Sequence, residues 1–153
     1  MVFVRELPEA QQKRMLGQEL PDFGEAPWAT GPALASRRIA IITTAGLHKR
    51  DDRPFGAGSG EYRVIPGDTE SADLVMSHGS TNFDRSGFQL DINTVFPIDR
   101  LRECRDDGVI GEIADFHYAF MGATHPELMA AAAADVAGLL KADKVDGVIF
   151  SPV

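Results

Sequence analysis

The sequence predicts an α/β fold, with a mostly parallel sheet and flanking helices in an open, Rossmann-like, three-layer arrangement. Apolar segments of strand length alternate with segments of helical periodicity, which is typical of this class. Residues 145–150 are predicted to form a strand, and the short continuous apolar run that follows Gly147 is expected for a parallel strand covered on both faces. We expect the domain to be incomplete on its C-terminal side; the alternative is a sheet that ends with this run as an edge strand.

The chain divides into two parts of different composition. Residues 1–34 form an N-terminal accessory segment in which residues 8–18 are predicted helical and are followed by repeated prolines and glycines. Phe23 and Trp28 are expected to attach this segment to the rest. Residues 35–153 form the α/β domain, which we interpret as the first part of a longer domain.

Five strands and two helices are predicted in the α/β domain. The second helix starts at Thr124-His125-Pro126-Glu127, which has the spacing of a capping box with proline in the first turn. The predicted strands are residues 38–42, 61–65, 73–76, 109–118 and 145–150, the helices are residues 97–108 and 124–140, and residues 49–60 are a loop.

The turns after the strands are expected to meet. Parallel strands place their carboxyl ends on one edge of a sheet, where ligands of α/β proteins bind. The positive end of the helix that follows Thr124 would favour an anionic group there, such as a substrate carboxylate. The turns are residues 43–48, 77–81, 121–124 and 151–153.

Composition excludes several classes of function. The chain has 153 residues, 44% of them hydrophobic, a length that suits one domain. The net charge of −8, with no basic stripe, argues against nucleic acid as a partner. No apolar run approaches the roughly 20 residues of a membrane span, and no leader is visible, so we expect a cytoplasmic protein. The glycines do not have the spacing of a nucleotide-binding loop.

The segment from Ser77 to Phe88 is the strongest candidate site. His78 is suited to general acid or base catalysis, and Arg85 to clamping a carboxylate. The alternative is structural: Asp84 and Arg85 would form an ion pair, and His78 would donate to a backbone carbonyl.

The remaining histidines and the single cysteine carry weaker signals. His48 closes the first turn and has about even odds of facing the crevice, whereas His117 alternates with aromatic residues and is expected in the core. The four histidines lie on separate segments, so no metal site is predicted. Cys104 lies in a charged helix and is expected to be a packing residue.

Four segments resemble one protein family. They are Tyr62 to Asp68, Ser77 to Phe88, Asn93 to Leu101 and Phe120 to Ala123. The chain from about Arg38 to Val153 resembles the selenoprotein B family of glycine, sarcosine, betaine and D-proline reductases. The resemblance implies reductive cleavage of a carbon–nitrogen bond in a small amino acid or its N-methylated relative.

The resemblance also implies a nucleophile outside the printed sequence. A selenocysteine, or a cysteine replacing it, is expected directly after Val153, and UGA, the selenocysteine codon, is readily read as stop. No other cofactor is expected in this chain. By the same resemblance, His78 is the predicted catalytic residue; Thr44, Gly46, His48, Ser80, Arg85 and Thr124 are predicted to bind substrate.

The resemblance implies partner proteins as well. A pyruvoyl group on a partner subunit would activate the amine, a selenoprotein A-like protein would accept the product, and we expect an oligomer. Two other readings stay open. An amino-acid racemase would need two thiols, and the chain has only Cys104. A non-catalytic subunit would use the polar loop to hold a small carboxylate or a partner protein.

Overall fold

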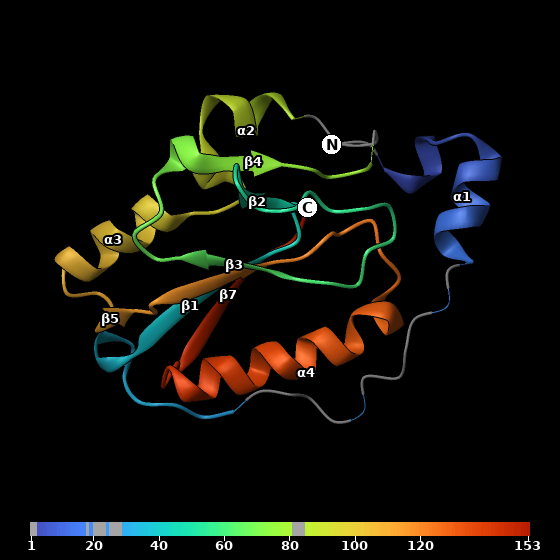
Figure 1. Cartoon of the computed structure of the whole chain (residues 1–153). Coiled ribbons are helices and arrows are strands. Elements are labelled where there is room, and N and C mark those ends of the chain that lie inside the picture. Colours follow the sequence, from blue (N-terminus) through green and yellow to red (C-terminus); the bar gives the residue numbers. More distant parts are fainter. Residues whose placement is uncertain (1–2, 18, 20–23, 25–28, 81–84) are drawn as a thin grey trace.

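A mixed sheet forms the centre of the molecule in a computed structural model, which describes residues 3–17, 19, 24, 29–80 and 85–153 (Figure 1). Strand β1 (Arg38–Thr43) pairs in parallel with β5 (Glu112–Ile113) and β6 (Phe116–Ala119) on one side. On its other side β1 pairs in parallel with β7 (Gly147–Ser151).

The sheet differs from the predicted one at its β6 side. Strand β3 (Arg63–Pro66) pairs with β6 in the antiparallel direction. The α/β class is therefore confirmed, whereas a mostly parallel, Rossmann-like sheet is not. Whether two strands are parallel or antiparallel depends on the path of the connection between them. An alternating pattern of apolar residues carries no information about that direction.

A separate two-stranded ribbon lies beside the sheet. Strand β2 (Leu47–Lys49), which the sequence analysis assigned to a turn and loop, pairs antiparallel with β4 (Leu74–Met76). The prediction that β4 belongs to the main sheet was wrong. Gly46, with a left-handed φ of 65°, turns the chain out of β1, and its carbonyl accepts a hydrogen bond from the Ser77 N–H.

Helices and the ribbon cover the two faces of the sheet (Figure 1). Helix α4 (Pro126–Ala142) packs on one face, where Val136 meets Tyr118 and Phe120. Helix α3 (Ile98–Asp106), the short helix η4 (Ile92–Thr94) and the ribbon share the apolar core of the other face. Among the described residues, no helix combines the length and the apolar character needed to cross a bilayer.

The remaining described elements are short. The predicted helix in the accessory segment is present as α1 (Glu9–Leu16), which buries none of its residues. Phe23 and Trp28 lie outside the described residues, and the boundary between residues 34 and 35 stays a prediction. The other short helices are η1 (Val4–Glu6), η2 (Leu34–Ser36), η3 (Ser71–Asp73) and α2 (Ser86–Leu90).

The predicted capping box of α4 is not formed. The helix begins at Pro126, as proline at a first helical position favours, and His125 is the residue at the cap position. Thr124 therefore lies one residue too early to cap the helix. Its hydroxyl donates instead to the Ser59 carbonyl, at 3.0 Å.

The predicted strand over residues 109–118 is divided into β5 and β6. From Ile39 to Ile42, β1 advances by three residues, whereas the paired segment advances by five, from Ile113 to Tyr118. The segment between β5 and β6 therefore bulges. His117, which is fully buried, fills the gap: its Nδ1 accepts the Ile41 N–H at 3.0 Å. A side chain thus replaces the missing ladder hydrogen bond, and the expectation that His117 belongs to the core is confirmed.

Candidate functional site

Four turns meet at the carboxyl ends of β1, β6 and β7. The Thr44 N–H donates to the Ser151 carbonyl, and the Gly122 N–H donates to the Thr44 carbonyl, at 3.1 and 2.8 Å. The Val153 N–H donates to Thr44 Oγ1 at 2.8 Å. The Gly79 N–H points at the Met121 sulfur, 3.4 Å away. The convergence that the sequence predicted is therefore present.

Two glycines allow the turns to approach so closely. A Cβ on Gly122 would lie 2.5 Å from the Val153 carbonyl oxygen and 3.0 Å from that of Thr44. A Cβ on Gly46 would lie 3.1 Å from the His78 backbone nitrogen, and its φ of 65° already favours glycine. Larger residues at either position would force the strand ends apart.

His78 lies in the middle of these turns and is 5% exposed. Burial lowers the pKa of His78 below its ordinary value, and the charge of Arg85 lowers it further, whereas a hydrogen bond with the Val153 backbone raises it. Its Nδ1 accepts the Ser80 N–H at 3.2 Å, which assigns the ring proton of the neutral form to Nε2. A neutral imidazole here is a hydrogen-bond donor at Nε2.

His48 reaches the site through a second residue. Its Nδ1 lies 2.7 Å from the Lys49 carbonyl, so that nitrogen must donate. In the neutral ring Nε2 then accepts from the Ser77 hydroxyl, 2.6 Å away. His48 therefore fixes the residue before His78, a positioning contact that the sequence analysis did not identify.

Arg85 holds the turn that contains His78. Its Nη2 donates to the carbonyls of His78 and Ser80, at 2.5 and 2.8 Å. This geometry agrees with the loop-ordering alternative for Arg85. Asp84, its predicted ion-pair partner in that alternative, lies outside the described residues.

A pocket of about 280 Å³ opens beside these turns. Gly79, Ser80, Met121 and Ala123 line one part of it, and Ala57, Gly58 and Arg14 line the rest. Arg14 comes from α1, and the sequence analysis did not select it because nothing in a polar helix marks which of its cations faces a pocket. Thr124 holds the loop of Ala57 and Gly58 in place through its hydrogen bond to Ser59.

Other groups do not join this site. A larger hollow of about 670 Å³ lies at the opposite end of the sheet, but its cations Arg102 and Arg105 already pair with Asp99 and Asp106. Within the described ranges, no three potential metal-binding side chains cluster. Cys104 packs against the core, so it does not face the site.

Comparisons with known proteins agree with the sequence pattern. Residues 19–152 match the family described as glycine/sarcosine/betaine reductase selenoprotein B. The D-proline reductase subunit gamma of Acetoanaerobium sticklandii is 34% identical over 121 residues, which are 77% of this chain and 49% of that protein. No solved structure matches the chain significantly.

Two further relatives are subunits of reductase complexes. The sarcosine reductase complex component B subunit beta of Peptoclostridium acidaminophilum is 32% identical over 67% of this chain and 25% of its own length. The glycine reductase complex component B subunit gamma of Symbiobacterium thermophilum is 30% identical over 86% of this chain and 32% of its own length. The chain thus spans half or less of these relatives, and its match from residue 19 to 152 shows that it belongs to the glycine/sarcosine/betaine reductase selenoprotein B family.

Proposed function

We propose that the chain is part of the substrate-activating component of a reductase that cleaves the carbon–nitrogen bond of a small amino acid or N-methylated amine. The observation that carries the proposal is the meeting of the turns around His78, Thr44 and the Val153 backbone. The names of the relatives, which act on D-proline, sarcosine and glycine, support the reaction class.

The nucleophile of the proposal is a selenocysteine, or a cysteine replacing it, directly after Val153. Thr44 binds Val153 through both backbone groups, with Oγ1 at 2.8 Å from the nitrogen and 3.3 Å from the oxygen. A residue at the next position would therefore start from a fixed backbone inside the group of turns. A selenolate there would supply attack on the substrate α-carbon and displacement of the amine.

His78 is the proposed hydrogen-bond donor of the site. Burial lowers its pKa, which favours the neutral ring, and the proton of that ring is on Nε2. That nitrogen can donate a hydrogen bond to an anion at the following position and so stabilise it. Gly46, His48 and Arg85 would act by holding the His78 turn, through the contacts described above.

The pocket is the proposed substrate site, with Ser80 and the Thr124-anchored loop at its wall. A volume of about 280 Å³ suits a small molecule. Arg14 supplies a cation for the substrate carboxylate, because one terminal nitrogen of Arg85 is committed to two carbonyls. A pyruvoyl-bearing subunit would activate an amine that retains an N–H, and a selenoprotein A-like partner would take the product.

The codon that follows Val153 is the first test. UGA, UGC or UGU there supports the proposed nucleophile, whereas UAA or UAG contradicts it. The second test is turnover of glycine, sarcosine, betaine and D-proline by the complete subunit with its partner subunits. Replacement of the proposed nucleophile by serine is expected to abolish product formation.

Variants of this complex separate the roles of the site residues. His78→Gln is expected to lower kcat about 10²–10³-fold, with His125→Gln, an exposed histidine, as the control. Arg14→Gln is expected to raise KM about tenfold, the loss of one charge-assisted hydrogen bond, whereas Lys13→Gln, which removes a neighbouring cation outside the pocket lining, should not. Full activity of His78→Gln would contradict the role of His78 as a hydrogen-bond donor.

A further inference from the structure

The outer edge of β7 is open. Among the described strands, β7 pairs only with β1. The Thr44 N–H donates to the Ser151 carbonyl, so the backbone groups of Ser151 face β1. Backbone groups of successive residues in a strand point to opposite sides, so those of Val148 and Phe150 face away from β1, toward the open edge. Residues 147–151 contain no charge and no proline, the features that usually protect an edge from pairing. The edge is thus able to accept another strand.

The side chain of Phe150 is exposed next to this edge. Phe150 pairs with Ile42, whose side chain packs in the cluster under α4, so Phe150 points to the α4 face of the sheet. It is nevertheless 72% exposed, because α4 lies over β6 and β1 and does not reach it. Together with the unpaired edge of β7, this exposed aromatic side chain favours a surface that a partner covers.

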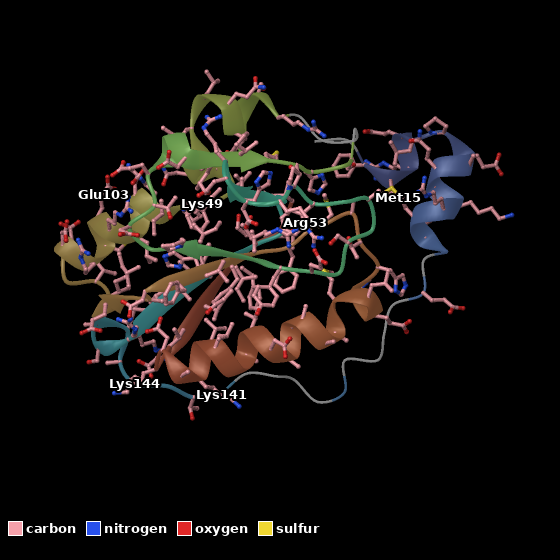
Figure 2. All side chains as sticks on the ribbon, in the orientation of Figure 1. Met15, Lys49, Arg53, Glu103, Lys141 and Lys144 are labelled. Carbon is pink, nitrogen blue, oxygen red and sulfur yellow. The ribbon has the colours of Figure 1, made fainter. Side chains whose placement is uncertain are left out.

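Helix α4 presents a close-packing stripe on the same side. Its Met129 and Val136 face the sheet, and Leu128 and Asp135 face the β3 side, where they line a hollow with Tyr62. The helical period therefore places the exposed residues Ala130, Ala133 and Ala137 on the β7 side of the helix. Lys141 projects outward at the end of the helix (Figure 2). Alanines allow another helix to approach within about 8 Å.

A strand with a helix attached to it would cover both the open edge of β7 and the alanines of α4. Helix α4 joins β6 to β7 across β1, and right-handed crossovers place a helix that leads to a strand beyond β7 on the same face as α4. A strand beside β7 would pair with its open edge, and its helix would cover Phe150 and the alanines. The matched relatives have the necessary length, since this chain spans 49%, 32% and 25% of theirs.

We propose that this open-edge surface, formed by Val148, Phe150, Ala130, Ala133 and Ala137, binds a strand–helix unit, and that the additional length of the relatives outside the matched region supplies such a unit. The strand pairs in parallel with β7, and an apolar helix packs on α4. The inference rests on family membership and topology and not on the chemistry of the pocket, so the two can fail separately.

The test is to mix this chain with the unmatched part of the A. sticklandii D-proline reductase subunit gamma and to follow amide hydrogen exchange. Exchange at Val148 and Phe150 is expected to slow at least about tenfold, while the β3 amides, on the opposite edge of the sheet, stay unchanged. Phe150→Lys should abolish the effect, and Val64→Lys, at an exposed position of β3, should not. Slowing without the added segment, together with a dimeric mass by light scattering, would overturn the proposal in favour of a second copy.

A covalent fusion of the same segment to this chain tests the proposal even where the separate segment does not fold. In a Cys104→Ser background, Ala133→Cys is expected to react with a maleimide about tenfold more slowly in the fusion than in the chain alone. Asp135→Cys, on the other side of α4, is the matched control and should keep its rate. Equal reactivity of both cysteines in the fusion would contradict the proposal.

Discussion

The two ends of β1 are built from different chemistry. At the amino end the Arg38 guanidinium, 17% exposed, pairs with Glu112, Asp115 and Asp143. Burial opposes its charge, but the hydrogen bonds and charges of Asp143 and Asp115 raise the pKa of Arg38 above its ordinary value. At the carboxyl end the groups are hydroxyls, an imidazole and backbone amides around Thr44 and His78.

The difference separates stability from function. The charges at the amino end have fixed partners within the chain, so they are not available to a ligand. Loss of one partner would leave a partly buried charge without compensation and would destabilise the fold. The carboxyl end combines a neutral buried imidazole with glycines that let backbone groups approach closely. In α/β sheets this second end is where ligands bind. His117 lies midway between the two ends of β1. Like the amino end it has a structural role, because its Nδ1 accepts a buried hydrogen bond from the Ile41 N–H.

The largest expected effect is at His117. His117→Ala would leave the buried Ile41 N–H without its acceptor and create a cavity beside Phe96, so the free energy of unfolding should fall by about 4 kcal/mol. Urea denaturation measures this change. His125→Ala, at an exposed position, should change stability by less than about 0.5 kcal/mol. Equal losses from both variants would remove the distinction between a structural and a surface histidine.

The pH dependence of stability sharpens the same point. Burial, aided by the charge of Arg102 and opposed by Asp143, lowers the pKa of His117 from 6.5 to about 4. Between these values the unfolded chain binds a proton that the folded chain does not, so stability falls by about 3 kcal/mol as pH falls through this window. Above pH 6.5 this contribution is constant. His117→Gln should flatten the profile measured by urea denaturation; an unchanged slope would show that His117 does not control it.

The amino end should affect stability without affecting the site. Arg38→Met would leave Asp143, whose side chain is 15% exposed, without its cation, at a cost of about 2 kcal/mol after allowance for solvent. The Arg100–Glu103 pair is exposed, so Arg100→Gln should cost less than about 0.5 kcal/mol. Thermal unfolding checks both. A change in substrate KM in Arg38→Met would contradict the separation of the two ends.

The smallest expected difference is the one between alanine substitutions at two glycines. Gly46 and Gly58 both have left-handed φ, of 65° and 67°, so alanine at either should cost about 1–2 kcal/mol. A Cβ at Gly58 meets nothing within 4 Å, whereas one at Gly46 meets the His78 backbone at 3.1 Å. Gly46→Ala should therefore cost about 1 kcal/mol more and raise KM as well. If urea denaturation gave the same loss of stability for Gly46→Ala and Gly58→Ala, the turn at Gly46 would be able to move away from the His78 backbone at no cost.

The local pattern of residues was sufficient to predict the strands and the helix that position the site. The apolar runs that became β1 and β7, and the helical spacing that became α4, were predicted nearly at their observed positions. The resemblance to the selenoprotein B reductases was likewise readable from consecutive residues, and the family match confirms it. Both are properties of adjacent residues, which is why one sequence is enough to see them.

The sequence by itself thus determined the α/β class, the family and the turns that meet at the site. Tertiary structure alone decided the antiparallel direction of β3, the β2–β4 ribbon, the acceptor role of His117 and the position of Arg14 beside the pocket. Each of these depends on partners far apart in the chain. Hydrogen bonds and pocket walls form between such partners only after the strands pair and the helices pack, and a pattern of neighbouring residues does not encode that geometry.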